Sequence, residues 1–85
     1  MKLSFISSAQ IRAARALLRW SAADLASKAS VGANTVRRAE VAEGKTSLTA
    51  ANEMAIRRAL EDAGIIFIDE NGGGAGVRLK SPIAK

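Results

Sequence analysis

The chain has no cysteine, no histidine and no tyrosine among its 85 residues, and its aromatic residues are one tryptophan and two phenylalanines. Without cysteine there is no disulfide bond and no thiolate nucleophile. Without histidine as well, ordinary zinc sites and most nucleophile–base pairs are excluded, because their ligands and bases come from these two residue types. The acidic residues form no evident acid–base pair. We therefore expect no metal site, no cofactor and no enzymatic activity.

Long apolar runs are also missing. The start, MKLSFISSAQ, has too short an apolar run for a signal peptide, and no stretch of the sequence is long enough to span a bilayer. The absence of cysteine fits a reducing compartment. We expect a cytoplasmic protein that makes no contact with a membrane.

Positive charge is concentrated in one half of the chain. Residues 1–47 contain eight Lys and Arg against three Asp and Glu, a net charge of +5, whereas residues 48–85 contain five of each sign. The length suits one domain with a small core, and the many alanines favour closely packed helices. A basic half joined to a neutral half indicates a surface that faces a polyanion, backed by a scaffold. The alternative is that these cations solvate an ordinary surface.

Four helices are predicted from their start and stop signals. Ser7 and Gln10 have the spacing of a capping box, and Ser21 and Asp24 repeat it. A third helix begins after Gly32, which is an acceptable N-cap residue. The predicted helices span residues 8–18, 22–29, 33–40 and 50–63.

The sequence changes its pattern at the end of the fourth helix. Either Ser47 or Thr49 caps that helix, and Gly64 stands where a C-terminal glycine belongs. IIFI is β-branched and aromatic, DENGGGAG is a turn cluster, and VRLK alternates apolar and cationic residues. The glycines lack the GxGxxG or Walker pattern of a phosphate-binding loop, so we interpret them as a turn. The prediction is a β-hairpin at 65–80 and a loose tail at 81–85.

The second and third predicted helices, with the tight turn between them, have the pattern of a helix-turn-helix. Ala26 is small enough to let the two helices approach, and Val36 fills the space between them. The stretch RAARALLRWSAADLASKASVGANTVRRAE resembles the phage Cro and repressor family of XRE-type regulators, and the resemblance covers roughly residues 9–64. The family usually has glycine where Ser30 stands. The resemblance implies a mainly α fold, in which residues 1–64 form a four-helix, lambda-repressor-like helix-turn-helix domain ahead of the hairpin.

The resemblance also implies which residues would contact DNA. It places the third helix in the major groove and the second across the DNA backbone. Arginine and asparagine can form paired hydrogen bonds to the edges of guanine and adenine. The residues implied to face bases are Ala33, Asn34, Arg37 and Arg38. The residues implied to contact or attract phosphates are Ser21, Ala22, Gly32, Thr35, Lys45, Lys28 and Arg19. Arg15 and Glu40 match an ion pair of the family that ties the first helix to the third.

A partner is expected because one recognition helix reads too few base pairs for useful affinity, so this class usually binds as a two-fold dimer. The IIFI strand has no polar side, and both of its faces need cover. We predict a homodimer built by the hairpin; the alternative is that the hairpin completes the core of one subunit. The predicted interface residues are Ile65, Ile66, Phe67, Ile68, Val77 and Leu79.

The sequence thus predicts a sequence-specific DNA-binding transcriptional regulator, namely a dimeric repressor or autoregulator that occupies a palindromic operator in double-stranded DNA. The alternative is a protein-interaction module, antitoxin- or antiactivator-like, that uses the same fold to bind a protein partner. The basic third helix favours DNA, whereas the apolar tail leaves room for a protein partner.

Overall fold

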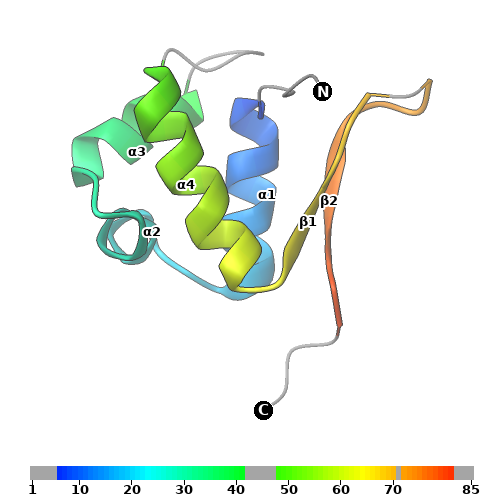
Figure 1. Ribbon diagram of the computed structural model, residues 1–85, viewed down its shortest axis with the longest axis horizontal. Helices are drawn as coiled ribbons and strands as arrows, with labels where there is room; N and C mark the ends of the chain where they lie inside the picture. Colours follow the sequence, from blue (N-terminus) through cyan, green and yellow to red (C-terminus); the bar gives the residue numbers. More distant parts are fainter. Residues whose placement is uncertain (1–5, 42–47, 71, 82–85) are drawn as a thin grey trace.

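The computed structural model describes residues 6–41, 48–70 and 72–81. Within them the chain is mainly helical and ends in a two-stranded antiparallel sheet, as the sequence predicted (Figure 1). The elements are α1 (Ser8–Leu18), α2 (Ala22–Ala29), α3 (Ala33–Val41), α4 (Ala50–Asp62), β1 (Ile65–Ile68) and β2 (Gly76–Leu79). None of the described helices is long and apolar enough to cross a membrane.

Three boundaries differ by one residue from the predicted ones. α3 continues through Val41. α4 ends at Asp62, ahead of Gly64, whose φ of 105° is incompatible with a right-handed helix. β2 begins one residue earlier than the VRLK pattern indicates, because Gly76 pairs with Ile68 across the ladder.

Side-chain caps fix where three of the helices begin. Ser7 Oγ accepts a hydrogen bond from the Gln10 amide at 3.1 Å, and Gln10 Oε1 accepts one from the Ser7 amide at 2.8 Å. Ser21 and Asp24 make the same reciprocal pair at 3.0 and 2.9 Å. Both predicted capping boxes are therefore confirmed. α4 is capped by Thr49, whose hydroxyl accepts a hydrogen bond from an amide of the first helical turn.

The core fills the space between the four helices. Ala26 and Val36 are both buried at the contact between α2 and α3, as the sequence predicted. Glu53 is a buried acid, and its carboxylate accepts a hydrogen bond from the Ile6 amide at 2.8 Å. The buried apolar residues of the described chain are Ile6, Ile11, Ala14, Leu25, Ala26, Ala29, Val36, Ala39, Ile56, Leu60 and Ile65.

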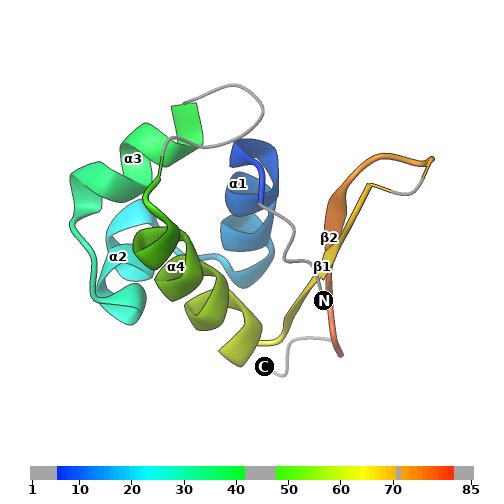
Figure 2. The ribbon, with the colours of Figure 1, turned by 45° about the horizontal axis from the view of Figure 1, so that its top comes forward.

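The hairpin lies beside α1, on the side of the molecule away from α2 and α3 (Figures 1 and 2). Its ladder pairs Ile65 with Leu79 and Phe67 with Val77. These four side chains belong to, or pack against, the core, so they form the inward face of the sheet. Because side chains alternate along a strand, the residues between them point to the opposite face.

Burial within the chain limits which of the predicted interface residues a second copy could contact. Ile65 is only 3% exposed, so it has no surface to offer to a second copy. The other three residues of the inward face are half-buried against the core of their own chain. The inward face of the hairpin therefore packs with the core of its own chain. Ile66 and Ile68 are the predicted interface residues that lie on its outer face.

A single glutamine of α1 holds the hairpin against the helices. Gln10 Nε2 donates hydrogen bonds to the carbonyl oxygens of Ile68 and Gly76, at 3.2 and 3.0 Å. These two residues are directly opposite each other in the ladder. Gln10 therefore binds both strands at the end of the ladder that leads into the glycine-rich turn.

The turn after α2 contains a residue in left-handed backbone conformation. Ser30 has a φ of 58° and a ψ of 43°, the region that residues other than glycine adopt at a cost of roughly 1–2 kcal/mol. Glycine has no Cβ and escapes this cost, although it loses more freedom on folding.

We expect Ser30→Gly to raise the free energy of unfolding by about 0.5–1 kcal/mol, because the relief of the left-handed strain exceeds the entropic cost of glycine. Urea unfolding followed by circular dichroism measures this change. Ser27→Gly, at an exposed position inside α2, is the matched control and should lower stability by about 0.5 kcal/mol. A loss of stability in both variants would contradict the strain at Ser30.

Candidate nucleic-acid interface

α2 and α3 lie side by side and are joined by a turn whose backbone is fixed at both ends (Figures 1 and 2). The Val31 amide donates to the Ala26 carbonyl at 3.0 Å, which closes the last turn of α2. The Gly32 carbonyl accepts from the Thr35 and Val36 amides at 3.0 and 3.3 Å, which opens α3. Gly32 itself is exposed. The relative placement of the two helices is therefore set by the turn as well as by the core.

α3 presents a polar, cationic face to solvent. Asn34, Arg37 and Arg38 are exposed, whereas Ala33 and Thr35 are half-buried. Arg37 Nη1 donates a hydrogen bond to Asn34 Oδ1 at 3.1 Å, so these two side chains lie together one turn apart. The structure thus brings together, on one short helix, the four residues implied to face bases.

An ion pair from α1 fixes the end of α3. Arg15 Nε and Nη2 donate to the two carboxylate oxygens of Glu40, at 2.7 and 2.9 Å. The remaining nitrogen, Nη1, donates to the Trp20 carbonyl at 2.9 Å. The hydrogen bond to Glu40 raises the pKa of Arg15 above its ordinary value, although burial acts in the opposite direction. The pair implied by the sequence is therefore formed, and it is bidentate.

Two further α1 side chains bind the backbone at the end of α3. Ser8 Oγ donates to the Ala39 carbonyl at 2.5 Å, and Arg12 Nη1 donates to the Glu40 carbonyl. The sequence reasoning missed both contacts. The sequence offers only a general signal for such contacts. The last carbonyls of any helix have no partner within it and attract donors and cations.

The start of α2 is occupied by its own cap. The Asp24 carboxylate accepts from the Ser21 amide, which places a negative charge at the positive end of the helix. Ser21 is exposed and Ala22 is half-buried. This end therefore attracts a phosphate less strongly than its free amides alone would.

Two of the cations implied to contact or attract phosphates lie outside α3 in the described part of the chain. Lys28 Nζ lies 5.6 Å from the centre of the Trp20 ring, and Lys28 lines a groove between α2 and α4. Arg19 is exposed just after α1, in left-handed conformation with a φ of 60°. Lys45 and the alternative cap Ser47 lie outside the described residues.

The described residues contain no cluster of three or more acidic side chains that could hold a metal ion. Comparison of the chain with models of protein families and with curated proteins finds no match. Because neither a metal site nor a related protein indicates the function, the inference about function depends on the surface of α3 and on the contacts that hold this helix.

We expect the pair between Arg15 and Glu40 to be strongly coupled. Glu40→Leu alone leaves a partly buried guanidinium without its carboxylate and should lower the free energy of unfolding by about 1.5–3 kcal/mol. Arg15→Met together with Glu40→Leu should cost about 1–2 kcal/mol less than the two single changes added. Urea unfolding of all four proteins measures the coupling.

The same cycle on Arg57 and Glu61 is the matched control. Their ion pair is one turn apart on α4 at 3.2 Å, and the Glu61 side chain is 46% exposed, so the coupling should be about 0.5 kcal/mol or less. Equal coupling in the two cycles would show that Arg15 does not have the special role that its geometry indicates.

Proposed function

We propose that this chain is a sequence-specific DNA-binding transcriptional regulator in which α2, the turn and α3 form a helix-turn-helix. One observation carries the proposal: Asn34, Arg37 and Arg38 are exposed on a helix whose opposite face is buried in the core. The end of that helix is also bonded to α1. Side chains that discriminate between bases must be presented from a rigid element, and α3 meets this requirement.

The side chains of α3 match the hydrogen-bonding groups in the major groove. An arginine donates to the O6 and N7 atoms of guanine, and an asparagine pairs with the N6 and N7 atoms of adenine. Arg37 and Asn34 are already bonded to each other, so we propose that they read neighbouring base pairs as a unit. Arg38, on the adjacent part of the helix surface, reads a separate position.

Attraction to phosphate supplies most of the non-specific affinity in this proposal. Residues 1–47 carry the whole net charge of +5, and this half contains α1, α2 and α3. Cations that neutralise phosphates release counterions, so affinity should fall steeply as salt is raised. Because the capping carboxylate of Asp24 weakens the start of α2, we assign this role chiefly to the arginines of residues 1–47.

A dimer would supply the affinity that one recognition helix lacks. In the proposed dimer, the outer face of the hairpin meets the same face of a second copy through Ile66 and Ile68, and the operator is a palindrome. Support comes from the placement of these two isoleucines, which are half-buried and lie on the face of the hairpin opposite the core of the described residues. The regulator would act by occupying its operator.

We expect Arg37→Ala and Arg38→Ala each to relax base preference at one position of the site by about 1–3 kcal/mol. Selection of bound duplexes from a random pool, repeated with each variant, measures this preference. Arg58→Ala is the matched control, because Arg58 is an exposed arginine on α4, outside both α3 and the outer face of the hairpin.

The outcome distinguishes the role of each arginine. A residue that binds phosphate would weaken binding to all sequences alike and lower the slope of log affinity against log salt by about one unit. No binding to duplex DNA at low salt, or a flat slope for the unchanged protein, would contradict the proposal and favour a protein-interaction module.

We expect Ile66→Thr with Ile68→Thr to weaken self-association at least tenfold, because the change keeps strand propensity and removes apolar surface. Analytical ultracentrifugation over a range of concentrations measures the dissociation constant. Val41→Thr is the control, since Val41 is an apolar side chain that is 78% exposed at the end of α3. Unchanged self-association in the double variant would remove the hairpin from the dimer interface.

A further inference from the structure

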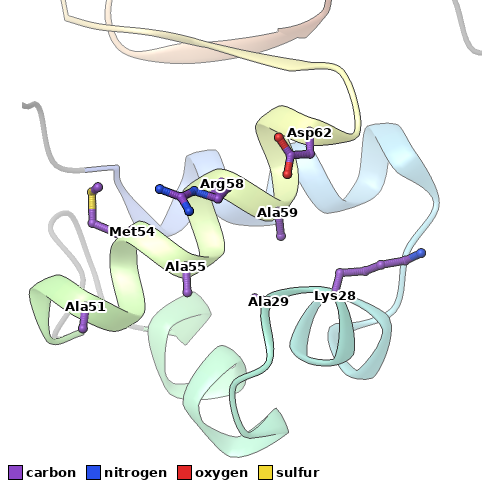
Figure 3. Close-up of a pocket in the computed structure, with 8 residues that line it drawn as sticks. All are labelled: Lys28, Ala29, Ala51, Met54, Ala55, Arg58, Ala59 and Asp62. Atoms are coloured by element: carbon purple, nitrogen blue, oxygen red, sulfur yellow. The ribbon is translucent and has the colours of Figure 1, made fainter.

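A groove of about 390 Å³ lies between α2 and α4. One wall is a face of α4 whose lining residues lie between Ala51 and Asp62. The other wall is the end of α2 at Lys28 and Ala29 (Figure 3). None of the residues that we assign to DNA on α3 lines it. The groove is therefore a separate surface, and a molecule bound in it leaves the exposed face of α3 free.

The floor of the groove is made of small side chains. Ala51, Ala55 and Ala59 recur every fourth residue along α4, and Ala29 of α2 faces them. A second row on α4, beside the alanines, begins with Met54, which is 44% exposed. Small residues in a row form a channel that accepts the side-chain ridge of another helix.

The shape of the groove favours a helical segment over a small molecule. Five of its eight lining residues are exposed, so the groove is shallow, whereas sites for small molecules bury most of the ligand surface. Along α4 it extends for eleven residues beyond Ala51, which is roughly 16 Å at the rise of an α-helix. That length matches about three turns of a bound helix.

The rim carries two cations and one acid, and the acid is Asp62 at the end of α4. The two cations define the partner further. Lys28 on α2 and Arg58 on α4 extend in opposite directions from the alanine floor (Figure 3). Within the described residues neither has an acidic partner. An apolar ridge seated on the alanines would therefore have a cation on each side, and acidic residues flanking that ridge would pair with both.

A second copy of this chain does not supply such a helix from its described part. α1 contains no acidic residue. The one acid of α2, Asp24, is held in the helix cap, and the one acid of α3, Glu40, is buried in its ion pair. α4 presents a row of alanines in this groove, and a row of small side chains supplies no apolar ridge to fill the same groove of a second copy.

We propose that the groove between α2 and α4 is a docking site for an amphipathic helix of another protein, with a narrow apolar ridge flanked on both sides by Asp or Glu. The alanine floor receives the ridge, Met54 extends the apolar contact, and Lys28 and Arg58 pair with the flanking carboxylates. The partner binds to the side of the molecule that does not read DNA, so it can join a DNA-bound regulator.

The probe is a synthetic 16-residue helical peptide with a Leu and Ala ridge flanked by glutamates. A second peptide with lysine in place of each glutamate is the charge control. We expect the acidic peptide to shift the backbone amide resonances of residues 28–29 and 51–62, and not those of residues 33–38.

Lys28→Glu with Arg58→Glu should weaken binding of the acidic peptide at least tenfold in calorimetry. Ala51→Leu, at an exposed position that fills the groove without changing its charge, should do the same.

Arg78→Glu makes the same kind of charge change on the hairpin and should leave peptide affinity within twofold. Circular dichroism shows whether each variant is folded. No binding of the acidic peptide, equal binding of the lysine peptide, or binding that survives Ala51→Leu would overturn the proposal. Self-association that is lost in Ala51→Leu would identify a second copy as the occupant instead. Duplex DNA affinity is measured in parallel. Loss of DNA affinity in the variant with Lys28→Glu and Arg58→Glu would make the groove a DNA contact. Loss of DNA affinity in the α3 variants alone bears on the proposed regulator and not on the groove.

Discussion

The bidentate pair between Arg15 and Glu40 is the constraint on which the presentation of α3 depends. A helix of nine residues is too short to be stable by itself, so its position comes from its contacts with the rest of the chain. The buried face of α3 gives it cohesion with the core, but apolar contacts are not directional. The ion pair and the hydrogen bonds from Ser8 and Arg12 are directional, and they fix how far α3 is turned about its axis. The outward direction of its cations follows from that rotation.

Much of the helical part was predictable because its signals are local. A capping box needs two residues three positions apart, so Ser7 and Gln10 could be identified without knowing any other part of the chain. Contacts between elements were harder. The hydrogen bond from Arg12 to the end of α3 depends on how α1 and α3 cross, and no short pattern in the sequence encodes this crossing. The exposure of Asn34, Arg37 and Arg38 was predictable because the apolar residues Val36 and Ala39 mark the inner face of α3.

The hairpin shows where alternation along a strand ceases to be informative. The strands themselves were predictable, but IIFI is apolar at every position, so its sequence does not indicate which residues face inward. The burial of Ile65 in the core settles this, and the ladder register shows which residues share its face. Similarly, the position of Lys28 beside α4 depends on packing between elements far apart in the sequence. A cation that the sequence grouped with the phosphate contacts therefore lines the groove between α2 and α4.

Gln10 has a consequence for how the molecule opens. Its side-chain oxygen completes the cap of α1, and its side-chain nitrogen is bonded to both strands of the hairpin. A two-stranded sheet is barely stable when it is detached. Because one side chain serves both elements, fraying of the first turn of α1 and release of the hairpin are parts of the same event. Amides in these two segments should therefore exchange with solvent as one cooperative unit, and a chain that loses its hairpin loses the beginning of its first helix with it.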